Sequence, residues 1–204
     1  MSRGILITFE GGEGTGKSTH IRFVTSYLRK KRKKVVVARE PGSTPIGEQI
    51  RSVLLHPKNK RMSVAAELFL YLAARAQLVE EIIRPALKQG KIVISDRFED
   101  STMAYQGYAG RFPMKTLKRL CKASRGTVMP RLTFLLDVDV RTGLKRSGRG
   151  DRMEQKSVGF HERIRRGYLQ LAKRNQKRIK VISTRLPKKE VERRIQKELD
   201  RVFA

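Results

Sequence analysis

The chain has 204 residues, 39% of them hydrophobic, and carries 47 Lys and Arg against 19 Asp and Glu, a formal net charge of +28. This length suits one domain with a full hydrophobic core, so we expect a single domain over residues 1–204. The apolar content excludes a disordered chain, and no stretch approaches the roughly 20 apolar residues of a membrane span.

Cysteine usage and the N-terminus bear on the compartment. Cys121 is the one cysteine of the chain, which excludes an internal disulfide and indicates a reducing compartment, the cytoplasm. The N-terminus runs directly into a strand-like segment, so we expect no signal peptide.

The excess of positive charge makes nucleic acid the obvious candidate partner. A nucleotide-handling enzyme from a strongly basic proteome is the alternative. The basic blocks at 29–34, 58–61 and 163–180 are scattered, and no aromatic residues interleave with them as in a base-stacking surface. We therefore expect most of this charge to be solvated surface, with weak, salt-sensitive and nonspecific contact with nucleic acid as a consequence.

Strand and helix patterns alternate from the start of the chain. Residues 4–10, GILITFE, form a short apolar run rich in β-branched residues, which predicts a buried strand. Residues 16–33 repeat apolar side chains at the spacing of one helix face. A second strand is predicted over 34–40, and a second helix over 44–56, which opens with Thr-Pro.

A long helical segment covers residues 63–90. Ser63 is a suitable N-cap, Gly90 a suitable stop, and we expect Pro85 to kink the helix. Three further strands and a closing amphipathic helix follow, at 91–96, 131–139, 180–184 and 187–203. Strands separated by helices of this length predict a parallel sheet covered on both faces, an α/β fold.

The stretch FEGGEGTGKST carries the first chemical signal. Gly11 is followed, after four residues, by Gly16-Lys17-Ser18, which fits the phosphate-binding pattern G-x-x-x-x-G-K-[ST] with a strand before it and a helix after it. Glycines let backbone N–H groups converge on an anion, and the helix directs its positive end to the same place. Lys17 can then reach the terminal phosphates and Ser18 can ligate magnesium.

A nucleoside triphosphate site leaves kinases, GTPases and mechanical ATPases open. The N-K-x-D motif that reads guanine is missing from the sequence, and motors and helicases are normally longer. A small-molecule kinase is the class that remains. It needs a second anion site, and Arg39 and Arg97 follow successive predicted strands at the edge where open α/β sheets bind ligands.

The sequence resembles the thymidylate kinase family. The motifs FEGGEGTGKST, REPG, LFLYLAARAQLV, SDRFEDSTMAYQG, PRLTFLLDVD, DRMEQ and GYLQLA occur in the family's order and cover nearly the whole chain. The resemblance implies a P-loop nucleoside-monophosphate kinase fold with five parallel strands flanked by helices and a short mobile lid at about 145–155. It also implies a homodimer that phosphorylates dTMP to dTDP with ATP and Mg²⁺.

The resemblance implies roles for individual residues. The ATP phosphates would be held by Gly11, Gly12, Glu13, Gly14, Thr15, Gly16, Lys17, Ser18 and Thr19. Arg39 and Arg97 would grip the dTMP phosphate, and Glu13 would face the deoxyribose. Phe69 would stack on thymine, and the remaining contacts to dTMP would come from Arg75, Ser101, Thr102, Tyr105 and Gln106. Asp96 resembles the acid that holds magnesium together with Ser18.

The lid is expected to supply catalytic charge. None of the variable positions 12–15 of the phosphate-binding loop is basic, whereas KRSGRGDRMEQ, residues 145–155, holds Arg146, Arg149 and Arg152. We expect these arginines to close over the ATP phosphates, with Arg149 or Arg152 carrying the main effect. The glycines of this stretch permit hinge-like motion.

One position departs from the family pattern. Ser43 stands where the family's REPGG loop has its second glycine, and a serine there is costly if that position needs positive φ.

Two alternatives to a thymidylate kinase stay open. The first alternative is a related nucleotide kinase with a different base choice. The second is a basic P-loop protein that binds nucleic acid without kinase activity.

Overall fold

The computed structural model describes residues 4–148 and 150–203. Within them, five strands form one sheet in the order β2-β3-β1-β4-β5, and every neighbouring pair is parallel. The strands are β1 Ile5–Glu10, β2 Val35–Arg39, β3 Ile92–Asp96, β4 Leu132–Asp137 and β5 Ile179–Ser183. The predicted five-stranded parallel sheet is confirmed, with strand bounds that differ by one or two residues.

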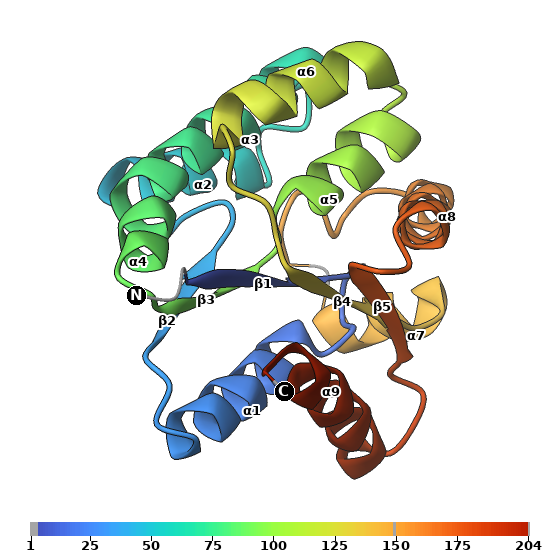
Figure 1. Cartoon of the computed structure of the whole chain (residues 1–204). Coiled ribbons are helices and arrows are strands. Elements are labelled where there is room, and N and C mark those ends of the chain that lie inside the picture. The colour runs from blue at the N-terminus through green and yellow to red at the C-terminus, as the bar shows by residue number, and fades with distance from the viewer. Residues whose placement is uncertain (1–3, 149, 204) are drawn as a thin grey trace.

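Helices cover both faces of this sheet. They are α1 Lys17–Lys30, α2 Pro45–Leu55, α3 Val64–Leu78, α4 Arg84–Lys88, α5 Glu99–Thr102, α6 Met114–Arg125, α7 Val140–Ser147, α8 Val158–Arg174 and α9 Lys188–Phe203. Figure 1 shows α1 and α9 below the sheet, α2 to α6 and α8 above it, and α7 beside the ends of β1 and β4.

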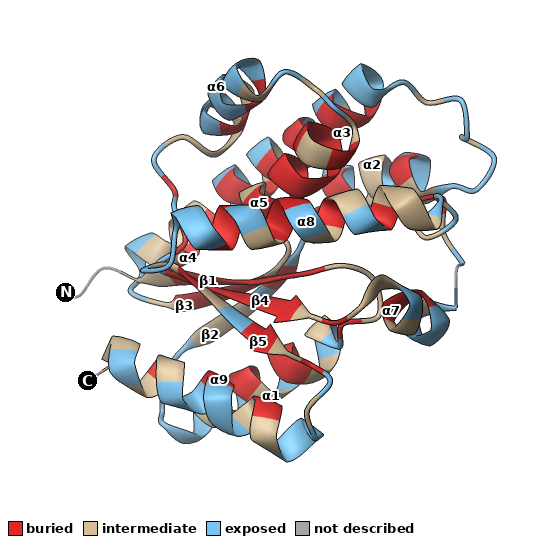
Figure 2. Ribbon diagram, turned by 90° about the vertical axis from the view of Figure 1, so that its right-hand side faces the viewer, coloured by how far each residue is buried: buried red, intermediate tan, exposed pale blue. Residues whose placement is uncertain are grey.

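The core lies in two layers, one on each side of the sheet, as the red segments of Figure 2 show. Below the sheet, Phe9 and Phe134 pack against α1 and α9 through Leu28 and Leu199, all of them fully buried. Because both faces of the sheet are covered, its strands are almost continuously apolar rather than alternating.

The long helical segment is not a uniform α-helix. Ser63 caps α3 as predicted, since its hydroxyl accepts the N–H of Ala66 at 3.2 Å. A π-helical turn, Val79–Ile83, then precedes Pro85, which lies in the first turn of α4. The wider turn lets the chain pass a residue that has no N–H to donate. Gly90, with φ of 71°, follows the end of α4.

The parallel arrangement brings the carboxyl ends of the strands to one edge. Glu10, Arg39, Asp96 and Asp137 are the last residues of β1, β2, β3 and β4. Ligands of open α/β sheets bind outside this edge. Asp139, just beyond β4, accepts the N–H of Thr142 at 2.9 Å and caps α7, the role its sequence position favours.

Candidate active site

A glycine-rich loop, residues 11–16, connects β1 to α1. Gly11, Gly14 and Gly16 have φ values of 138°, 62° and 83°, a region that glycine enters without steric cost. The loop therefore curls over the N-terminus of α1, where unpaired N–H groups and the positive end of the helix dipole favour an anion. This is the geometry that the phosphate-binding motif predicts.

Two glycines allow the backbone of this loop to lie directly against α7. A Cβ on Gly14 would lie 2.0 Å from the carbonyl oxygen of Gly143, and a Cβ on Gly143 would lie 2.4 Å from the carbonyl oxygen of Glu13. The two backbones can meet only because neither position has a side chain. Arg146, one turn beyond Gly143, consequently stands beside the loop.

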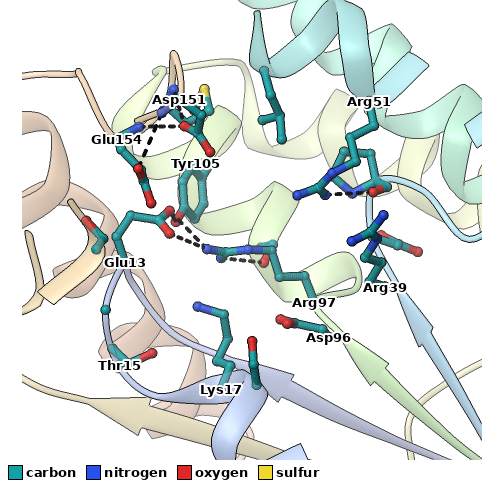
Figure 3. A pocket seen from close by; sticks show the side chains of 18 of the residues that line it. Glu13, Thr15, Lys17, Arg39, Arg51, Asp96, Arg97, Tyr105, Asp151 and Glu154 are labelled. Atoms are coloured by element: carbon teal, nitrogen blue, oxygen red, sulfur yellow. Dashed lines mark hydrogen bonds and ion pairs between the residues drawn. The ribbon is translucent and has the colours of Figure 1, made fainter. Parts of the chain in front are cut away.

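A cavity of about 650 Å³ opens above the loop, a size that suits a small-molecule site. Residues 13–19 form one wall, and residues that follow β2 and β3 form the wall opposite. Figure 3 shows Lys17 and Thr15 at one end, Arg39 and Arg51 at the other, Arg97 between them, and Asp151 and Glu154 above Tyr105. Gly11 and Gly12 instead line a small neighbouring pocket.

Lys17 projects from the first turn of α1 into the cavity. Its Nζ donates to the carbonyl oxygens of Gly12, at 2.9 Å, and Gly11, at 3.2 Å. Burial lowers the pKa of this ammonium and Arg97 lowers it further, while the carboxylate of Glu13 opposes them. Ser18 and Thr19 line the cavity next to it.

The residues expected to hold magnesium fit that ion. Asp96 lines the cavity, and its Oδ1 is buried without a hydrogen-bond partner among the described residues. A hard cation satisfies such an oxygen. Within the described part of the chain, no three His, Cys, Asp or Glu side chains could together enclose a metal. Magnesium would therefore depend on Asp96, the Ser18 hydroxyl, substrate phosphates and water.

Arg39 and Arg51 line the far end of the cavity, and Arg97 reaches from the end of β3 back to the glycine-rich loop, where it donates to the carbonyl oxygen of Gly11 at 3.0 Å. Arg39 pairs with Glu48 at 3.0 Å, and Arg51 donates to the carbonyl oxygen of Pro41 at 2.9 Å. The structure brings Arg39 and Arg97 to one cavity, as expected, and adds Arg51, which sequence reasoning missed. A signal was available: α2 starts directly after the REPGS loop, so its inward face returns to the same crevice.

Arg97 and Glu13 join the two ends of the cavity. Arg97 Nη2 lies 2.9 Å from Glu13 Oε1, which also accepts the hydroxyl of Tyr105 at 2.5 Å. Burial raises the pKa of the Glu13 carboxyl, but Arg97, Lys17 and the Tyr105 hydrogen bond outweigh it and hold the pKa at about 2. Arg97 also has a φ of 71°, a strained backbone for an arginine and one typical of functional sites.

A buried carboxylate supports this strained segment. Glu10 is inaccessible to solvent and accepts the N–H of Phe98 at 2.7 Å, the hydroxyl of Ser101 at 2.5 Å and that of Tyr168 at 3.0 Å. Burial, and then the charge of Asp100, raise the pKa of Glu10 from 4.5 to about 8, although the hydrogen bonds lower it in part.

This pKa predicts a loss of stability at alkaline pH. Because folding raises the pKa of Glu10, the folded chain holds the proton more tightly, and that stabilisation is full below about pH 4.5 and lost as pH rises through about 8. We expect the unfolding temperature of the wild-type protein to fall more between pH 5 and pH 9 than that of Glu10→Gln. Parallel curves by differential scanning calorimetry would rule this out.

Arg75 lines the part of the cavity expected to hold the phosphate acceptor, which we call the acceptor end. It is 1% exposed, and its guanidinium contacts Glu40 at 2.6 Å and donates to Thr102 Oγ1 at 2.9 Å. Of the other residues predicted for the acceptor, Ser101, Tyr105 and Gln106 line the cavity together with Arg75 and Thr102. Glu40, the acid of the REPGS loop, was not foreseen as the partner of Arg75.

The structure corrects the expectation for Phe69. This ring is 56% exposed and is not among the residues that line the cavity. Tyr71 lines it instead. Helix geometry explains the difference: Tyr71 is four residues before Arg75 and shares its face, whereas Phe69 is six residues before it and points away. The i, i+4 spacing was the signal that would have found Tyr71.

Arg146 and Arg152 of the expected lid have different surroundings. Arg146 is exposed and lines the cavity, while Arg149 lies outside the described residues. Arg152 is 2% exposed, does not line the cavity, and lies 2.6 Å from Glu67 in a buried ion pair. The expectation that Arg152 faces the phosphates is therefore corrected, because its guanidinium is buried beside the carboxylate of Glu67 and does not line the cavity.

Ser43 does adopt the strained backbone. Its φ is 70°, so the position favours glycine. The serine hydroxyl accepts the N–H of Arg39 at 2.8 Å, and its own N–H donates to Glu48 at 2.7 Å. These local bonds offset the cost of about 1 kcal/mol for the left-handed conformation. The hydroxyl is thus engaged with the backbone of Arg39.

Within residues 4–148 and 150–203, no helix combines the length and the apolar character needed to cross a membrane.

Comparison with known proteins gives a consistent picture. The family model described as thymidylate kinase matches residues 9–195. A thymidylate kinase of Symbiobacterium thermophilum is 44% identical over 201 residues, 98% of this chain and 94% of that one. A thymidylate kinase of Syntrophotalea carbinolica is 47% identical over 185 residues, 86% of each chain. The crystal structure of thymidylate kinase from Ehrlichia chaffeensis matches 98% of this chain and 99% of its own, with a TM-score of 0.80 and 34% identity.

Proposed function

The chain belongs to the thymidylate kinase family and catalyses the ATP-dependent phosphorylation of dTMP to dTDP, and we propose the residues that carry out this reaction. Its fold is that of the P-loop nucleoside-monophosphate kinases. The sequence left open whether the chain is a kinase or a P-loop protein without kinase activity, and family membership identifies it as a kinase.

The P-loop end of the cavity receives ATP. Backbone N–H groups of the loop hold the phosphates, while Ser18 and Thr19 add hydroxyls at the start of α1. Lys17, in contact with two loop carbonyls, turns to the phosphate that is transferred. Magnesium, when bound by Asp96, Ser18 and the phosphates, neutralises phosphate charge.

The arginine end receives the phosphate of dTMP. Arg39, Arg51 and Arg97 offer three guanidinium groups, each suited to paired hydrogen bonds with phosphate oxygens. Glu13 fixes Arg97 and, with Tyr105, faces the deoxyribose. The acceptor oxygen is ionised near neutral pH, so no protein base is required and catalysis rests on positioning and charge neutralisation.

The thymine ring occupies the space between α3 and the turn Met103–Ala109. Tyr71 stacks on the base, in the place expected of Phe69, and contributes about 1–3 kcal/mol by analogy with base stacking elsewhere. Arg75, Thr102 and Gln106 meet the edge of the base. Arg146, together with Arg149 of the lid, balances the charge of the transferring phosphoryl group.

One observation carries this proposal: a single cavity joins the P-loop to a cluster of arginines, with Glu13 and Arg97 between them. Incubation with ATP, Mg²⁺ and dTMP should give dTDP and ADP in equal amounts, measured by anion-exchange chromatography. Removal of Mg²⁺ with EDTA should stop the reaction. ADP release without dTDP would show that the arginine end does not hold the acceptor.

A homodimer is proposed from an apolar surface. Ile46 and Val53 of α2 are 49% and 45% exposed, and Val64 and Phe69 of α3 are 39% and 56% exposed. Ile46 and Val53 are seven residues apart and share a helix face. Large apolar side chains gathered on neighbouring helices are typical of an interface between subunits.

Phe69→Asp should convert the dimer to a monomer. Light scattering after gel filtration should give twice the 23.4 kDa chain mass for the wild-type protein and a single chain mass for the variant. Val181→Asp, at an apolar position that is 48% exposed on the edge strand β5, is the matched control and should remain dimeric. A wild-type monomer at micromolar concentration would contradict the proposal.

The high basic charge supports a weak contact with nucleic acid. Lys115, Lys118, Arg119 and Lys122 form an exposed stripe along α6 without a carboxylate partner among the described residues. Such a stripe supports weak, salt-sensitive contact with nucleic acid as a side activity.

The buried thiol of Cys121 and the intracellular supply of ATP support a location of the enzyme in the cytoplasm.

A further inference from the structure

One buried carboxylate connects the acceptor end of the cavity to the lid. Glu67, in the first turn of α3, is 6% exposed. Its Oε1 accepts the side-chain N–H of Gln106 at 2.9 Å. Its Oε2 lies 2.6 Å from Nη1 of Arg152, a close ion pair without hydrogen-bond geometry. Gln106 and Arg152 are each 2% exposed, so water does not compete for these contacts.

On the lid side, Arg152 anchors the segment that follows α7. Its backbone N–H donates to the carbonyl oxygen of Leu55 at 3.1 Å, and its Nε donates to that of Leu54 at 2.6 Å. These carbonyls end α2, where a cation is favourable. Asp151 and Met153, on either side of the buried arginine, face the cavity.

On the acceptor side, Glu67 controls which way the amide of Gln106 points. A carboxylate can only accept hydrogen bonds, so Gln106 must turn its NH₂ group toward Glu67. The guanidinium of Arg152, 2.6 Å away, pairs with the other oxygen of the same side chain. Gln106 lines the cavity, and the oxygen of its side-chain amide accepts no hydrogen bond from the described residues. The group offered to the base is thus an acceptor.

We propose that Glu67 is a positioning residue that sets base preference through the amide of Gln106. Thymine and uracil carry an N–H at ring position 3, whereas cytosine has a bare acceptor nitrogen there. An amide oxygen fixed toward the base accepts the N–H of thymine and repels cytosine, whose ring nitrogen finds no donor. This inference rests on the proposal that Gln106 meets the edge of the base.

Glu67→Gln is the direct test, because it keeps the shape and removes the constraint. The amide that this change introduces can donate as well as accept, so Gln106 is free to turn over and present its NH₂ group to cytosine. We expect the ratio of kcat/KM for dTMP to kcat/KM for dCMP to fall at least about tenfold, the discrimination of one well-placed hydrogen bond. A purely structural defect would lower both values and leave their ratio unchanged.

Two further variants make the result decisive. Glu80→Gln changes an exposed acid, 69% accessible, on the same helical segment and should leave the ratio at the wild-type value. If Glu67→Gln does not fold because Arg152 is left buried without its partner, the variant Glu67→Gln with Arg152→Gln removes both charges together. Its ratio should fall to the same extent.

The outcomes separate this inference from the proposed function. An unchanged ratio in a folded Glu67 variant overturns the role of Glu67, whatever the activity toward dTMP. A wild-type enzyme that does not convert dTMP would instead contradict the proposed function. A ratio that falls for Glu67→Gln and equally for Glu80→Gln would assign the effect to net charge and also overturn the inference.

Discussion

Replacing Lys17 by Met should lower kcat by about 10³-fold or more while leaving the fold intact. Removal of one well-placed donor to transition-state charge costs about 10²–10³-fold, and Lys17 supplies a full charge as well as a donor. The residue lies at the P-loop end of the cavity, where its ammonium donates to the carbonyl oxygens of Gly11 and Gly12, and methionine offers neither the charge nor the donor.

The measurement is steady-state ADP release at saturating ATP, Mg²⁺ and dTMP, with the unfolding temperature recorded in parallel. Lys30→Met, an exposed position in the last turn of α1, changes the same charge on the same helix and should retain wild-type kcat. Persistence of turnover in Lys17→Met would show that the glycine-rich loop does not hold the transferred phosphate.

Arg146→Met is expected to lower kcat by at least about 10²-fold with a much smaller change in KM for ATP. An arginine that meets charge in the transition state contributes about 10³–10⁵-fold in related phosphoryl transfers, and we propose that Arg146 and Arg149 share this role, so the loss of one of them has a smaller effect. Arg146 is placed for it because Gly14 and Gly143 allow α7 to touch the P-loop.

The control is Arg141→Met, an exposed arginine on α7 that does not line the cavity and should leave kcat unchanged. Arg152→Met provides a contrast. It leaves the carboxylate of Glu67 buried without its cation, which typically costs about 3–5 kcal/mol of stability. An Arg146→Met enzyme with wild-type kcat would remove this residue from the transition state.

The sheet and the P-loop could be predicted because local signals specify them. The apolar runs of β1 to β5 and the glycine positions can be read from short stretches of sequence, and the order strand, loop, helix is the context that the motif requires. The alignment of Arg39, Asp96 and Arg97 at one edge follows from parallel strands alone.

What the sequence did not reveal depends on side-chain direction and on long-range pairing. Phe69 and Tyr71 are both aromatic, and only the helix phase relative to Arg75 separates them. Arg152 and Arg146 are both lid arginines, and only the buried carboxylate of Glu67, far earlier in the chain, shows which one turns away from the cavity. Nor does the motif reveal that Gly143 is what brings α7 to the loop.

The contacts around the acceptor end also have no local signature. Glu40 meets Arg75 across 35 residues and Glu10 meets Ser101 across 91. Each of these acids follows or ends a predicted strand, so its position at the sheet edge was predictable. Its partner was not, because several arginines and hydroxyls compete for each acid and only packing selects among them.

Above all, we infer that the arginine end of the cavity holds the phosphate of a thymidine nucleotide beside the P-loop. The most direct measurement is ADP release with dTMP, dUMP, dCMP and thymidine as alternative acceptors, at saturating ATP and Mg²⁺. We expect dTMP to have the highest kcat/KM, and thymidine, which lacks the phosphate that Arg39, Arg51 and Arg97 would grip, to give no turnover above the rate without acceptor. Turnover of thymidine at a rate equal to that of dTMP would contradict the claim.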